Sequence, residues 1–434
     1  MRDVTVGIVG LGNIGGGTLE ILARSAEEIS RKLGFRLTVR AVCDRILESK
    51  TLPDGLGELR RTTDWREVTA DPEVDIVVEL IGGTSVAREV IEGAIAGGKS
   101  VVTANKELMG LAGVGLWRSA QARGVSLAME ASVCGGIPIH AVLREGIAGD
   151  SVDTLFGILN GTSNYILTEI EAHGTDFAVV LGEAQRLGYA EADPSADIDG
   201  YDARSKLALL ASLAFGVTVT PPSIHTDGIR RIGPVDFAYA RQMDCTIRLL
   251  GSARRGDGGL FLSVRPALIP LSTILAGVRG SYNAVWVKGR FGQDTFYYGR
   301  GAGPLPTGVA VVSDLMRLAR EIRYGNPNRV SPFGYSEPGV AEVLPLERQQ
   351  RPWYLRFCVK DRPGIIAEMA GILARHGISV DAVLQLPSSD KQNLPFVITV
   401  ESTPEAQVRK ALAELSALTY LVESPVSMPI EGGL

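Results

Sequence analysis

The residue types best suited to chemistry are concentrated in one segment near the middle of the chain. Residues 188–206 read GYAEADPSADIDGYDARSK, which places five carboxylates in a short stretch that ends in a lysine. An ordinary turn does not require so many acids, and a group of carboxylates suits a ligand that carries an ammonium group. If the chain becomes helical from Asp199, then Asp202 and Lys206 lie four residues apart on one face of the helix.

Lys206 is the strongest candidate in this segment for moving a proton. The apolar stretch 207–213 follows it at once, so the lysine lies where the helix enters a core. Burial disfavours the charged form of a lysine while the neighbouring Asp202 favours it, and the balance can poise the amine as an acid or a base. The alternative is an exposed ion pair with Asp202, worth only about 0.3–0.5 kcal/mol. The residues alone leave both interpretations open.

A glycine-rich turn near the amino terminus forms the second candidate site. Residues 10–15 read GLGNIG, between an apolar run typical of a buried strand and a helical pattern. In a dinucleotide-binding turn, Gly10 permits the tight bend, Gly12 lets a pyrophosphate approach the backbone, and Gly15 lets the helix pack close to the strand. The phosphates then meet the unpaired N–H groups at the positive end of the helix. The alternative is a glycine-rich turn with a structural role alone.

Charged residues also follow two other expected strands, at the ends where ligands bind in an open α/β sheet. Asp44 ends the second strand and could accept a hydrogen bond from a ribose 2′-hydroxyl, which favours NAD. Arg40 and Arg45 flank it and could pair with a 2′-phosphate, or could be solvated surface charges, so the choice of cofactor stays open. Lys106 follows a later strand and could reach the reacting centre, although a lysine at a helix terminus can also be a surface charge.

The elements expected to position these residues indicate an α/β fold at the amino terminus. Strands alternate with helices up to about residue 130, which is typical of βαβ units and a parallel sheet. We therefore expect a Rossmann-type dinucleotide-binding domain over residues 1–135, completed by a helix at 304–324. The expected strands cover 4–10, 37–44, 75–80, 100–103 and 125–130, and the expected helices cover 14–32, 86–96 and 106–123.

The remaining chain predicts two further domains. Helical patterns and segments of alternating polarity indicate an α+β domain over residues 136–303. Five prolines between residues 323 and 352 favour a linker over 325–352. Residues 353–434 follow the order βαββαβ, with the last strand expected at 420–424, which indicates a ferredoxin-like module.

The composition excludes several classes of protein. The formal net charge is −5 and no basic block occurs, so the chain is a poor candidate for binding nucleic acid. The longest apolar run, 207–219, is shorter than the roughly 18–20 residues that a membrane span needs. Four widely separated cysteines indicate neither a zinc ribbon nor a disulfide scaffold. No signal-peptide pattern precedes the first strand. We therefore expect a soluble protein of the reducing cytoplasm.

Several segments together resemble one enzyme family. They read GLGNIGGG, TANK, EASVCGGIPI, LNGTSNYIL, GYAEADPSADIDGYDARSK and GRGAGPLPT, in this order along the chain. This set closely resembles homoserine dehydrogenase, and the tail from Trp353, with KDRPG at 360–364, resembles an ACT regulatory domain. The resemblance covers nearly the whole chain. It implies the reversible NAD(P)-dependent interconversion of L-aspartate 4-semialdehyde and L-homoserine.

The resemblance also assigns roles to individual residues. Lys206 matches the proton donor and acceptor, with Asp202 as its positioning partner, and Lys106 matches a lysine that touches both cofactor and substrate. Glu191 matches the carboxylate that binds the substrate's ammonium group, and Asp197 lies in the same acidic group. Gly188 and Gly303 match positions near the nicotinamide. The expected cofactor-binding residues are Gly10, Gly12, Asn13, Ile14, Gly15, Arg40, Asp44, Arg45, Thr84, Lys106, Gly188 and Gly303.

The resemblance extends to a cation, an effector and an assembly. Glu130, Val133, Gly135 and Ile137 match a monovalent-cation site for Na⁺ or K⁺, built largely from backbone carbonyls; the alternative is a strand-end turn that needs no ion. The ACT module suggests feedback inhibition by L-threonine, or else a structural or oligomerisation role. Pairing through the second domain and the ACT module suggests a homodimer or a homotetramer.

Two rival functions stay open at this point. Cys134 stands where the family leads us to expect a glycine or an alanine, and it could be the nucleophile of a phosphorylating aldehyde dehydrogenase. That chemistry needs a base, and none of the four histidines lies in a motif that fits the role. A non-catalytic sensor of nucleotides and amino acids is the other rival, but it has no use for Lys106, Lys206 and the acidic segment.

Overall fold

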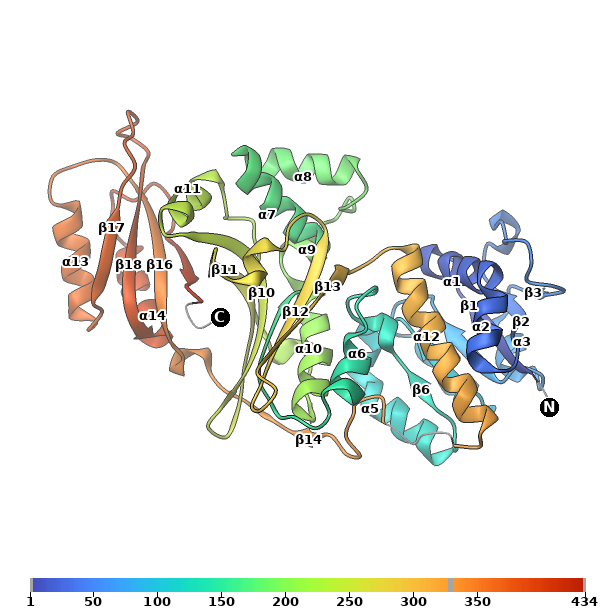
Figure 1. Ribbon diagram of the computed structural model, residues 1–434. Coiled ribbons are helices and arrows are strands. Elements are labelled where there is room, and N and C mark those ends of the chain that lie inside the picture. The colour runs from blue at the N-terminus through green and yellow to red at the C-terminus, as the bar shows by residue number, and fades with distance from the viewer. Residues whose placement is uncertain (1–2, 327–330, 432–434) are drawn as a thin grey trace. The chain divides into compact units, whose positions relative to one another are not determined.

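The structure is a computed structural model that describes residues 3–326 and 331–431 (Figure 1). Parts of the expected first domain, linker and ACT module therefore lie outside the described residues, at 1–2, 327–330 and 432–434. The chain forms two compact units. The first comprises Met1–Leu155, Ser205–Pro222 and Asn283–Ala341, and the second comprises Phe156–Arg204, Ser223–Tyr282 and Glu342–Leu434. The expected domain boundaries stay a prediction, because this division distributes residues 136–303 over both units.

A six-stranded parallel sheet dominates the first unit. Its order is β3-β2-β1-β4-β5-β6, which is the order of a dinucleotide-binding Rossmann sheet. The predicted parallel sheet is therefore confirmed. The strands are β1 (Val4–Val9), β2 (Leu37–Cys43), β3 (Arg60–Thr62), β4 (Ile76–Glu79), β5 (Ser100–Thr103) and β6 (Leu127–Ala128).

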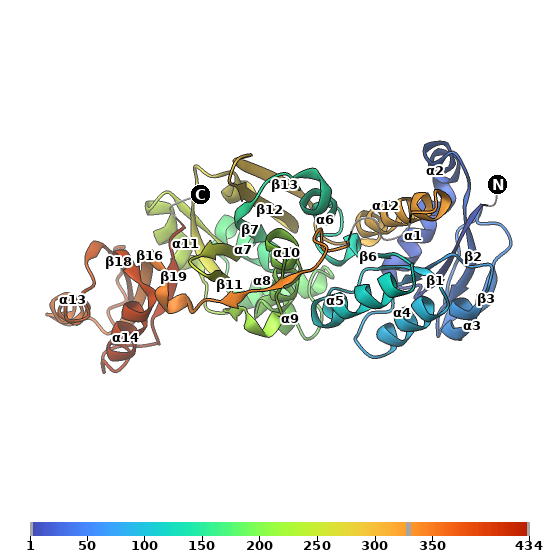
Figure 2. The ribbon, with the colours of Figure 1, turned by 90° about the horizontal axis from the view of Figure 1, so that it is seen from below.

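Helices cover this sheet and include one from late in the sequence. They are α1 (Asn13–Arg24), α2 (Ala26–Leu33), α3 (Trp65–Ala70), α4 (Val86–Ala96), α5 (Lys106–Ala122) and α12 (Pro304–Arg323). The single helix expected over 14–32 is wrong, since α1 ends before Ser25 and α2 begins after it. Figures 1 and 2 show α12 beside α1. The two helices approach closely because Gly17 faces the backbone of Pro304, where a β-carbon would have no room.

A seven-stranded sheet follows in the order β13-β12-β7-β10-β11-β15, with β9 also paired to β11. Its longest pair joins β10 and β11 in antiparallel register from Cys245–Pro270 to Gly256–Gly259. The strands are β7 (Val152–Ile158), β9 (His225–Thr226), β10 (Cys245–Gly256), β11 (Gly259–Pro270), β12 (Tyr282–Gly289), β13 (Asp294–Arg300) and β15 (Glu342–Val343).

The helices and short strands of this region occupy the segments between those strands. They are α6 (Ile139–Ala141), α7 (Gly161–His173), α8 (Phe177–Arg186), α9 (Ser195–Ile198), α10 (Tyr201–Phe215), α11 (Pro234–Gln242), β8 (Val217–Thr218) and β14 (Gly339–Val340). Strands β14 and β15 lie in the expected linker, so its described residues include short segments of regular structure.

The carboxyl-terminal module confirms the order βαββαβ. Its elements are β16 (Gln350–Val359), α13 (Ile365–Arg375), β17 (Val380–Leu384), β18 (Leu394–Pro404), α14 (Glu405–Leu415) and β19 (Val426–Pro429). The sheet has the order β17-β18-β16-β19, and α13 and α14 pack beside each other (Figure 2). The strand expected at 420–424 is wrong, because Leu421 forms only an isolated bridge and Tyr420 turns into the core.

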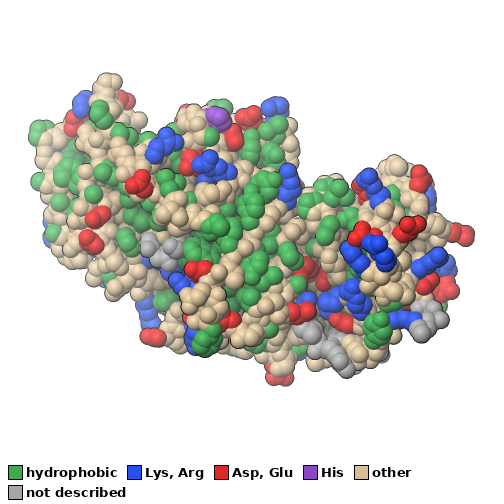
Figure 3. Space-filling view, in the orientation of Figure 1, with side chains coloured by type: hydrophobic (Ala, Val, Ile, Leu, Met, Phe, Trp, Pro, Cys, Tyr) green, Lys and Arg blue, Asp and Glu red, His purple; other side chains and the backbone are tan. Residues whose placement is uncertain are grey.

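Two further observations concern the surface charge and the hydropathy of the helices. On the face drawn in Figure 3, Lys and Arg side chains are interspersed with Asp and Glu side chains. Among the helices of the described residues, none is long and apolar enough to cross a membrane.

Candidate active site

The glycine-rich turn between β1 and α1 has the geometry of a phosphate-binding loop. Gly10 has a φ of 101°, and a β-carbon there would lie 2.7 Å from the backbone of Leu80. Gly15 faces the carbonyl oxygen of Gly10, which again leaves no room for a side chain. Gly12 is different, because a β-carbon there would meet nothing within 4 Å. The backbone is thus packed at Gly10 and Gly15 and open at Gly12, as close approach of a pyrophosphate requires.

The start of α1 adds to this preference for an anion. Gly12 occupies the N-cap position, no side chain caps the helix, and the first turn contains no acidic residue. The first N–H groups of a helix have no partners within the helix, and the helix dipole places positive charge there. Asn13 and Ile14 supply N–H groups of this first turn, which makes the turn a suitable place for phosphate.

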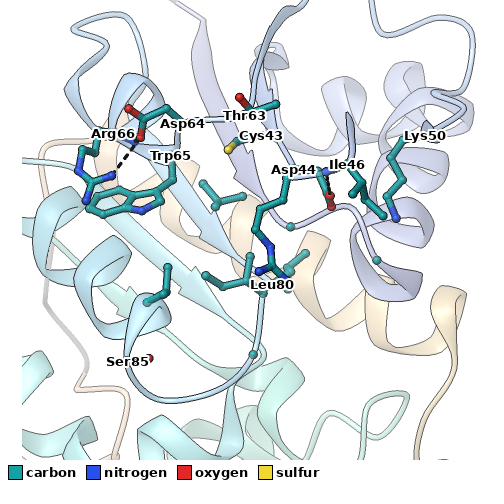
Figure 4. A pocket seen from close by; sticks show the side chains of 17 residues that line it. Cys43, Asp44, Ile46, Lys50, Thr63, Asp64, Trp65, Arg66, Leu80 and Ser85 are labelled. Atoms are coloured by element: carbon teal, nitrogen blue, oxygen red, sulfur yellow. Dashed lines mark hydrogen bonds and ion pairs between the residues drawn. The ribbon is translucent and has the colours of Figure 1, made fainter. Parts of the chain in front are cut away.

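A cavity of about 900 Å³ opens beside this turn (Figure 4). It contains the predicted residues Gly10, Gly12, Asp44 and Arg45. Most of the other lining residues were not predicted from the sequence; they lie at the ends of β3 and β4 and in the loops that follow these strands. The complete lining is Val9, Gly10, Gly12, Cys43, Asp44, Arg45, Ile46, Lys50, Thr63, Asp64, Trp65, Arg66, Leu80, Ile81, Gly82, Ser85 and Val86.

Asp44 is tied to the glycine-rich turn by its own carboxylate. One oxygen accepts the N–H of Leu11 at 2.7 Å and the other accepts the N–H of Ile46 at 3.0 Å. Burial alone would raise the pKa of Asp44, but these backbone hydrogen bonds, together with the positive charges of Lys50 and Arg45, outweigh it and the pKa lies below its usual value. Asp44 is therefore ionised at neutral pH and joins the end of β2 to the loop that follows β1.

Basic side chains line the same cavity. Arg45 and Lys50 come from the loop after β2, and Arg66 comes from α3. The guanidinium of Arg66 lies 4.5 Å above the Trp65 ring and pairs with Asp64 at 3.3 Å. Arg40 is absent from the lining and pairs with Glu73 instead. The cavity therefore offers positive charge from residues 45, 50 and 66 and not from residue 40.

Buried hydrogen bonds join the residues at the carboxyl ends of the neighbouring strands β4 and β5. Glu79 is fully buried and accepts the N–H of Ile81 at 2.8 Å and the hydroxyl of Thr103 at 2.7 Å. Asn105 caps α5 through Leu108 N–H and donates its amide to the carbonyl of Gly83 at 2.7 Å. Lys106, which begins α5, and Thr84, which follows Gly83, are placed by these contacts.

In the second unit, the acidic segment is organised around Asn160. The Nδ2 atom of Asn160 donates to Asp197 Oδ1 at 2.6 Å and to Asp202 Oδ2 at 2.8 Å. The two carboxylates come from α9 and from the first turn of α10, so a single amide joins two helices. Both acids were predicted from the sequence, but the role of Asn160 was not, because an asparagine before a helix predicts only an N-cap.

The other acids of the segment have different surroundings. Asp199 pairs with Arg230 at 2.5 and 2.8 Å, and this arginine lowers its pKa. Asp193 accepts both the hydroxyl and the N–H of Ser195, which lowers its pKa and forms a local turn. Glu191 is exposed, as is Gly188, which has a φ of 77°. Asp193 and Asp199 thus hold the loop, whereas Asp197 and Asp202 form a pair.

Lys206 lies on α10, which confirms the helix predicted for it. It follows Asp202 by four residues, is partly buried, and directly precedes the fully buried Leu207. Helix α10 passes from the second unit into the first between residues 204 and 205. Gly303, also predicted for the site, is the N-cap of α12 and has a φ of 126°, a backbone conformation that favours glycine.

Comparison with known proteins decides the family. The chain matches the profiles of the homoserine dehydrogenase catalytic domain over residues 138–316, its NAD-binding domain over 10–130 and the ACT domain over 353–419. It is 41% identical to the homoserine dehydrogenase of Pseudomonas aeruginosa, with 99% of both chains covered. It is 35% identical to the homoserine dehydrogenase of Bacillus subtilis, with 100% of this chain and 99% of the relative covered. The chain belongs to the homoserine dehydrogenase family.

Solved structures agree with this family. A homoserine dehydrogenase from Thiobacillus denitrificans has a TM-score of 0.92 and 42% identity, with 99% of both chains covered. A hyperthermophilic archaeal homoserine dehydrogenase in complex with NADPH has a TM-score of 0.62 and 26% identity, and covers 75% of this chain and 99% of its own. The chain is thus an NAD(P)-dependent oxidoreductase that acts on a CH–OH group, with an ACT domain at its carboxyl end.

The surroundings of Cys134 do not support its role as the nucleophile of a phosphorylating aldehyde dehydrogenase. Cys134 is 1% exposed and has a φ of 53°, which explains why a glycine suits this position. Its sulfur lies 3.9 Å from the amide nitrogen of Asn283. The nearby His140 is fully buried, and its ring nitrogens have no hydrogen-bond partner in the described part of the chain. Among the described residues, the His140 ring is therefore not hydrogen-bonded to this thiol as a general base would be.

The predicted metal-binding property is likewise unsupported. Both carboxylate oxygens of Glu130 accept backbone N–H groups, from His140 at 2.9 Å and from Ala141 at 2.8 Å. The carbonyl of Ile137 accepts the N–H of Ile139. Residues 3–326 and 331–431 contain no cluster of three or more His, Cys, Asp or Glu side chains that could hold a metal ion. A site made from the carbonyls of Val133, Gly135 and Ile137 stays a prediction.

Proposed function

We propose specific roles for the residues of this homoserine dehydrogenase in the interconversion of L-aspartate 4-semialdehyde and L-homoserine. The bound nicotinamide coenzyme supplies the hydride or accepts it. Asp197 and Asp202, joined by Asn160, together with Glu191, bind the ammonium group of the amino-acid substrate. The observation that carries this proposal is the pair of carboxylates that Asn160 joins, one of which, Asp202, lies one helical turn before Lys206.

Lys206 handles the proton in this proposal. As charge develops on the carbonyl oxygen of the semialdehyde, the Lys206 ammonium stabilises it and then donates its proton. In the reverse direction the neutral amine removes the proton from the homoserine hydroxyl. Asp202 positions Lys206 from the preceding turn of α10, and Lys106 supplies a second positive charge next to the coenzyme.

The test of these roles is homoserine oxidation measured with NAD⁺ and NADP⁺ in parallel, with and without L-threonine. Homoserine-dependent formation of reduced coenzyme is the expected result. A purified, folded chain that forms none with either coenzyme would exclude the proposed roles. Phosphate-dependent oxidation of the semialdehyde, lost in Cys134→Ser, would support the rival enzyme in their place.

The cavity beside the glycine-rich turn favours NADP(H) within the NAD(P) class. Arg45 and Lys50 line it near Asp44, where the adenosine ribose of a dinucleotide is expected. Guanidinium and ammonium groups stabilise a 2′-phosphate through charge-assisted hydrogen bonds. The ionised Asp44 carboxylate opposes this preference, because it repels a 2′-phosphate. Both of its oxygens, however, already accept backbone N–H groups.

The ACT domain is proposed to bind L-threonine, a product formed downstream of homoserine. A cavity of about 280 Å³ lies at the turn between β16 and α13 and is lined by Asp361, Arg362, Gly364 and Gln385, among others. The N–H groups at the start of α13 and Arg362 suit a carboxylate, and Asp361 suits an ammonium group. Inhibition by threonine that disappears in Gln385→Ala, with uninhibited activity retained, is the expected result.

A point variant is a better test of the effector than removal of the ACT domain. Asp236 of α11, fully buried, pairs with Arg356 of β16 at 2.7 Å, and Arg265 of β11 pairs with Glu405 at 2.9 Å. Removal of residues 353–434 would leave Asp236 and Arg265 without these partners, which costs several kcal/mol for a buried charge. Loss of activity in a truncated chain would therefore report misfolding and not regulation.

Three further expectations from the resemblance complete the proposal. We infer a homodimer or a homotetramer, a cytoplasmic location, and a bound Na⁺ or K⁺ near Glu130. Light scattering of the purified chain tests the first, and cell fractionation tests the second. Activity in buffers that contain Na⁺, K⁺ or only a bulky organic cation tests the third.

A further inference from the structure

The amide of Asn160 makes three hydrogen bonds that connect distant parts of the sequence. Besides its donations to Asp197 and Asp202, its Oδ1 atom accepts the N–H of Ser163 at 2.8 Å and so caps α7. The side chain is 5% exposed, between the end of β7 and the start of α7. Both of its N–H groups are therefore directed to carboxylates, and its oxygen is directed to the helix.

We propose that Asn160 is a positioning residue that holds Asp197 and Asp202 beside each other in the form that binds the substrate's ammonium group. This inference rests on the proposed role of the two acids in substrate binding. Two neighbouring carboxylates repel each other, and without compensation one of them binds a proton. A side-chain amide donates a hydrogen bond to each carboxylate at once and stabilises both charged forms.

The neutrality of asparagine matters as much as its two donors. A lysine or an arginine at position 160 would also hold the two acids, but its positive charge would compete with the substrate's ammonium group. Asn160 orients the carboxylates without neutralising their negative charge. Ser163 strengthens the arrangement, because its buried hydroxyl donates to the carbonyl of Asp197 at 2.8 Å.

A purely structural role of Asn160 makes a different prediction from a positioning role. As an N-cap, asparagine is equivalent to aspartate and serine, so Asn160→Asp and Asn160→Ser both keep α7 capped. Neither replacement can donate to two carboxylates. Serine has one donor, and aspartate adds a third negative charge beside Asp197 and Asp202.

The experiment compares the full-length wild type, Asn160→Ser and Asn160→Asp by homoserine and NADP⁺ kinetics and by thermal unfolding. The KM for homoserine is expected to rise about tenfold in Asn160→Ser, which keeps one of the two donors, and further in Asn160→Asp, which keeps neither. The KM for NADP⁺ is expected to stay near the wild-type value, whereas the unfolding temperature is expected to fall in both variants because the lost hydrogen bonds also stabilise the fold. Equal homoserine KM values in all three proteins would overturn the inference.

A second background separates this inference from the proposed role of the acids. In Asp197→Asn, the effect of adding Asn160→Ser is expected to shrink, because the two positions act on one contact. A full additional tenfold loss would overturn the positioning role. If Asp197→Asn and Asp202→Asn both leave the homoserine KM unchanged, the proposed function of the acids fails. If only the Asn160 variants leave it unchanged, the acids keep their role and Asn160 does not.

Discussion

The glycine-rich turn of the first unit and the acidic segment of the second unit are both suited to charged ligands, but they are built in different ways. The turn relies on backbone: an open Gly12, a helix start without a side-chain cap, and the N–H groups after it. The acidic segment relies on side chains that approach from separate elements, namely Asn160, Asp197, Asp202 and Arg230. A backbone site tolerates many side-chain changes, whereas a side-chain site depends on each partner.

Replacement of Lys206 by alanine should have the largest effect on this homoserine dehydrogenase. Removal of a general acid and base typically costs a factor of about 10²–10⁴, so kcat is expected to fall by that order while the coenzyme KM changes little. Steady-state kinetics of folded protein measure this. Near-normal kcat would remove Lys206 from the mechanism and leave the acidic segment without its chemical partner.

The backbone character of the glycine-rich turn can be tested with Gly12→Ala. A β-carbon at Gly12 enters open space, so the chain folds normally while the methyl group occupies the approach to the phosphates. The coenzyme KM is expected to rise by roughly 10–100-fold, since misplaced phosphates lose charge-assisted hydrogen bonds. Gly16→Ala is the matched control, because a β-carbon there also meets nothing within 4 Å. Equal coenzyme KM values for the two variants would show that the turn binds no phosphate.

The side chains around the 900 Å³ cavity should affect coenzyme choice more than catalysis. Arg45→Ala together with Lys50→Ala is expected to raise the KM for NADP⁺ about tenfold, with little change for NAD⁺, since only the 2′-phosphate loses partners. The measurement is the ratio of kcat/KM for the two coenzymes. A parallel loss with both would place these residues at the pyrophosphate or at the loop fold, and not at the ribose.

The pair of Arg230 and Asp199 should show the smallest effect, because Arg230 is half exposed. Arg230→Gln is expected to raise the homoserine KM by less than about fivefold, because solvent and salt screen an exposed ion pair. The pair depresses the folded-state pKa of Asp199, so its contribution to stability is present above the usual carboxyl range and is lost as pH falls through the lowered pKa.

Thermal unfolding of wild type and Arg230→Gln from pH 7 to pH 3 checks that sign. The difference in unfolding temperature is expected to be largest near neutral pH and to disappear in acid. A difference that stays the same as the pH falls would mean that Arg230 stabilises the loop by packing and not by its charge.

Features that depend on local backbone rules and on periodicity are predictable from the amino-acid sequence. The turn at residues 10–15, the parallel strands, the helix that carries Asp202 and Lys206, and the βαββαβ order of the ACT domain were all predictable for that reason. Glycine requirements and hydrophobic periods act over a few residues, so they are legible in the chain alone.

Contacts between distant side chains depend on the three-dimensional fold. It divided the expected helix 14–32 at Ser25, paired Arg40 with Glu73, and brought Asn160 to two acids that lie 37 and 42 positions later. Hydrogen bonds and ion pairs act over about 3 Å in space and are indifferent to separation along the chain. A partner such as Asn160 is therefore recognisable only after the folded chain has placed it beside Asp197 and Asp202.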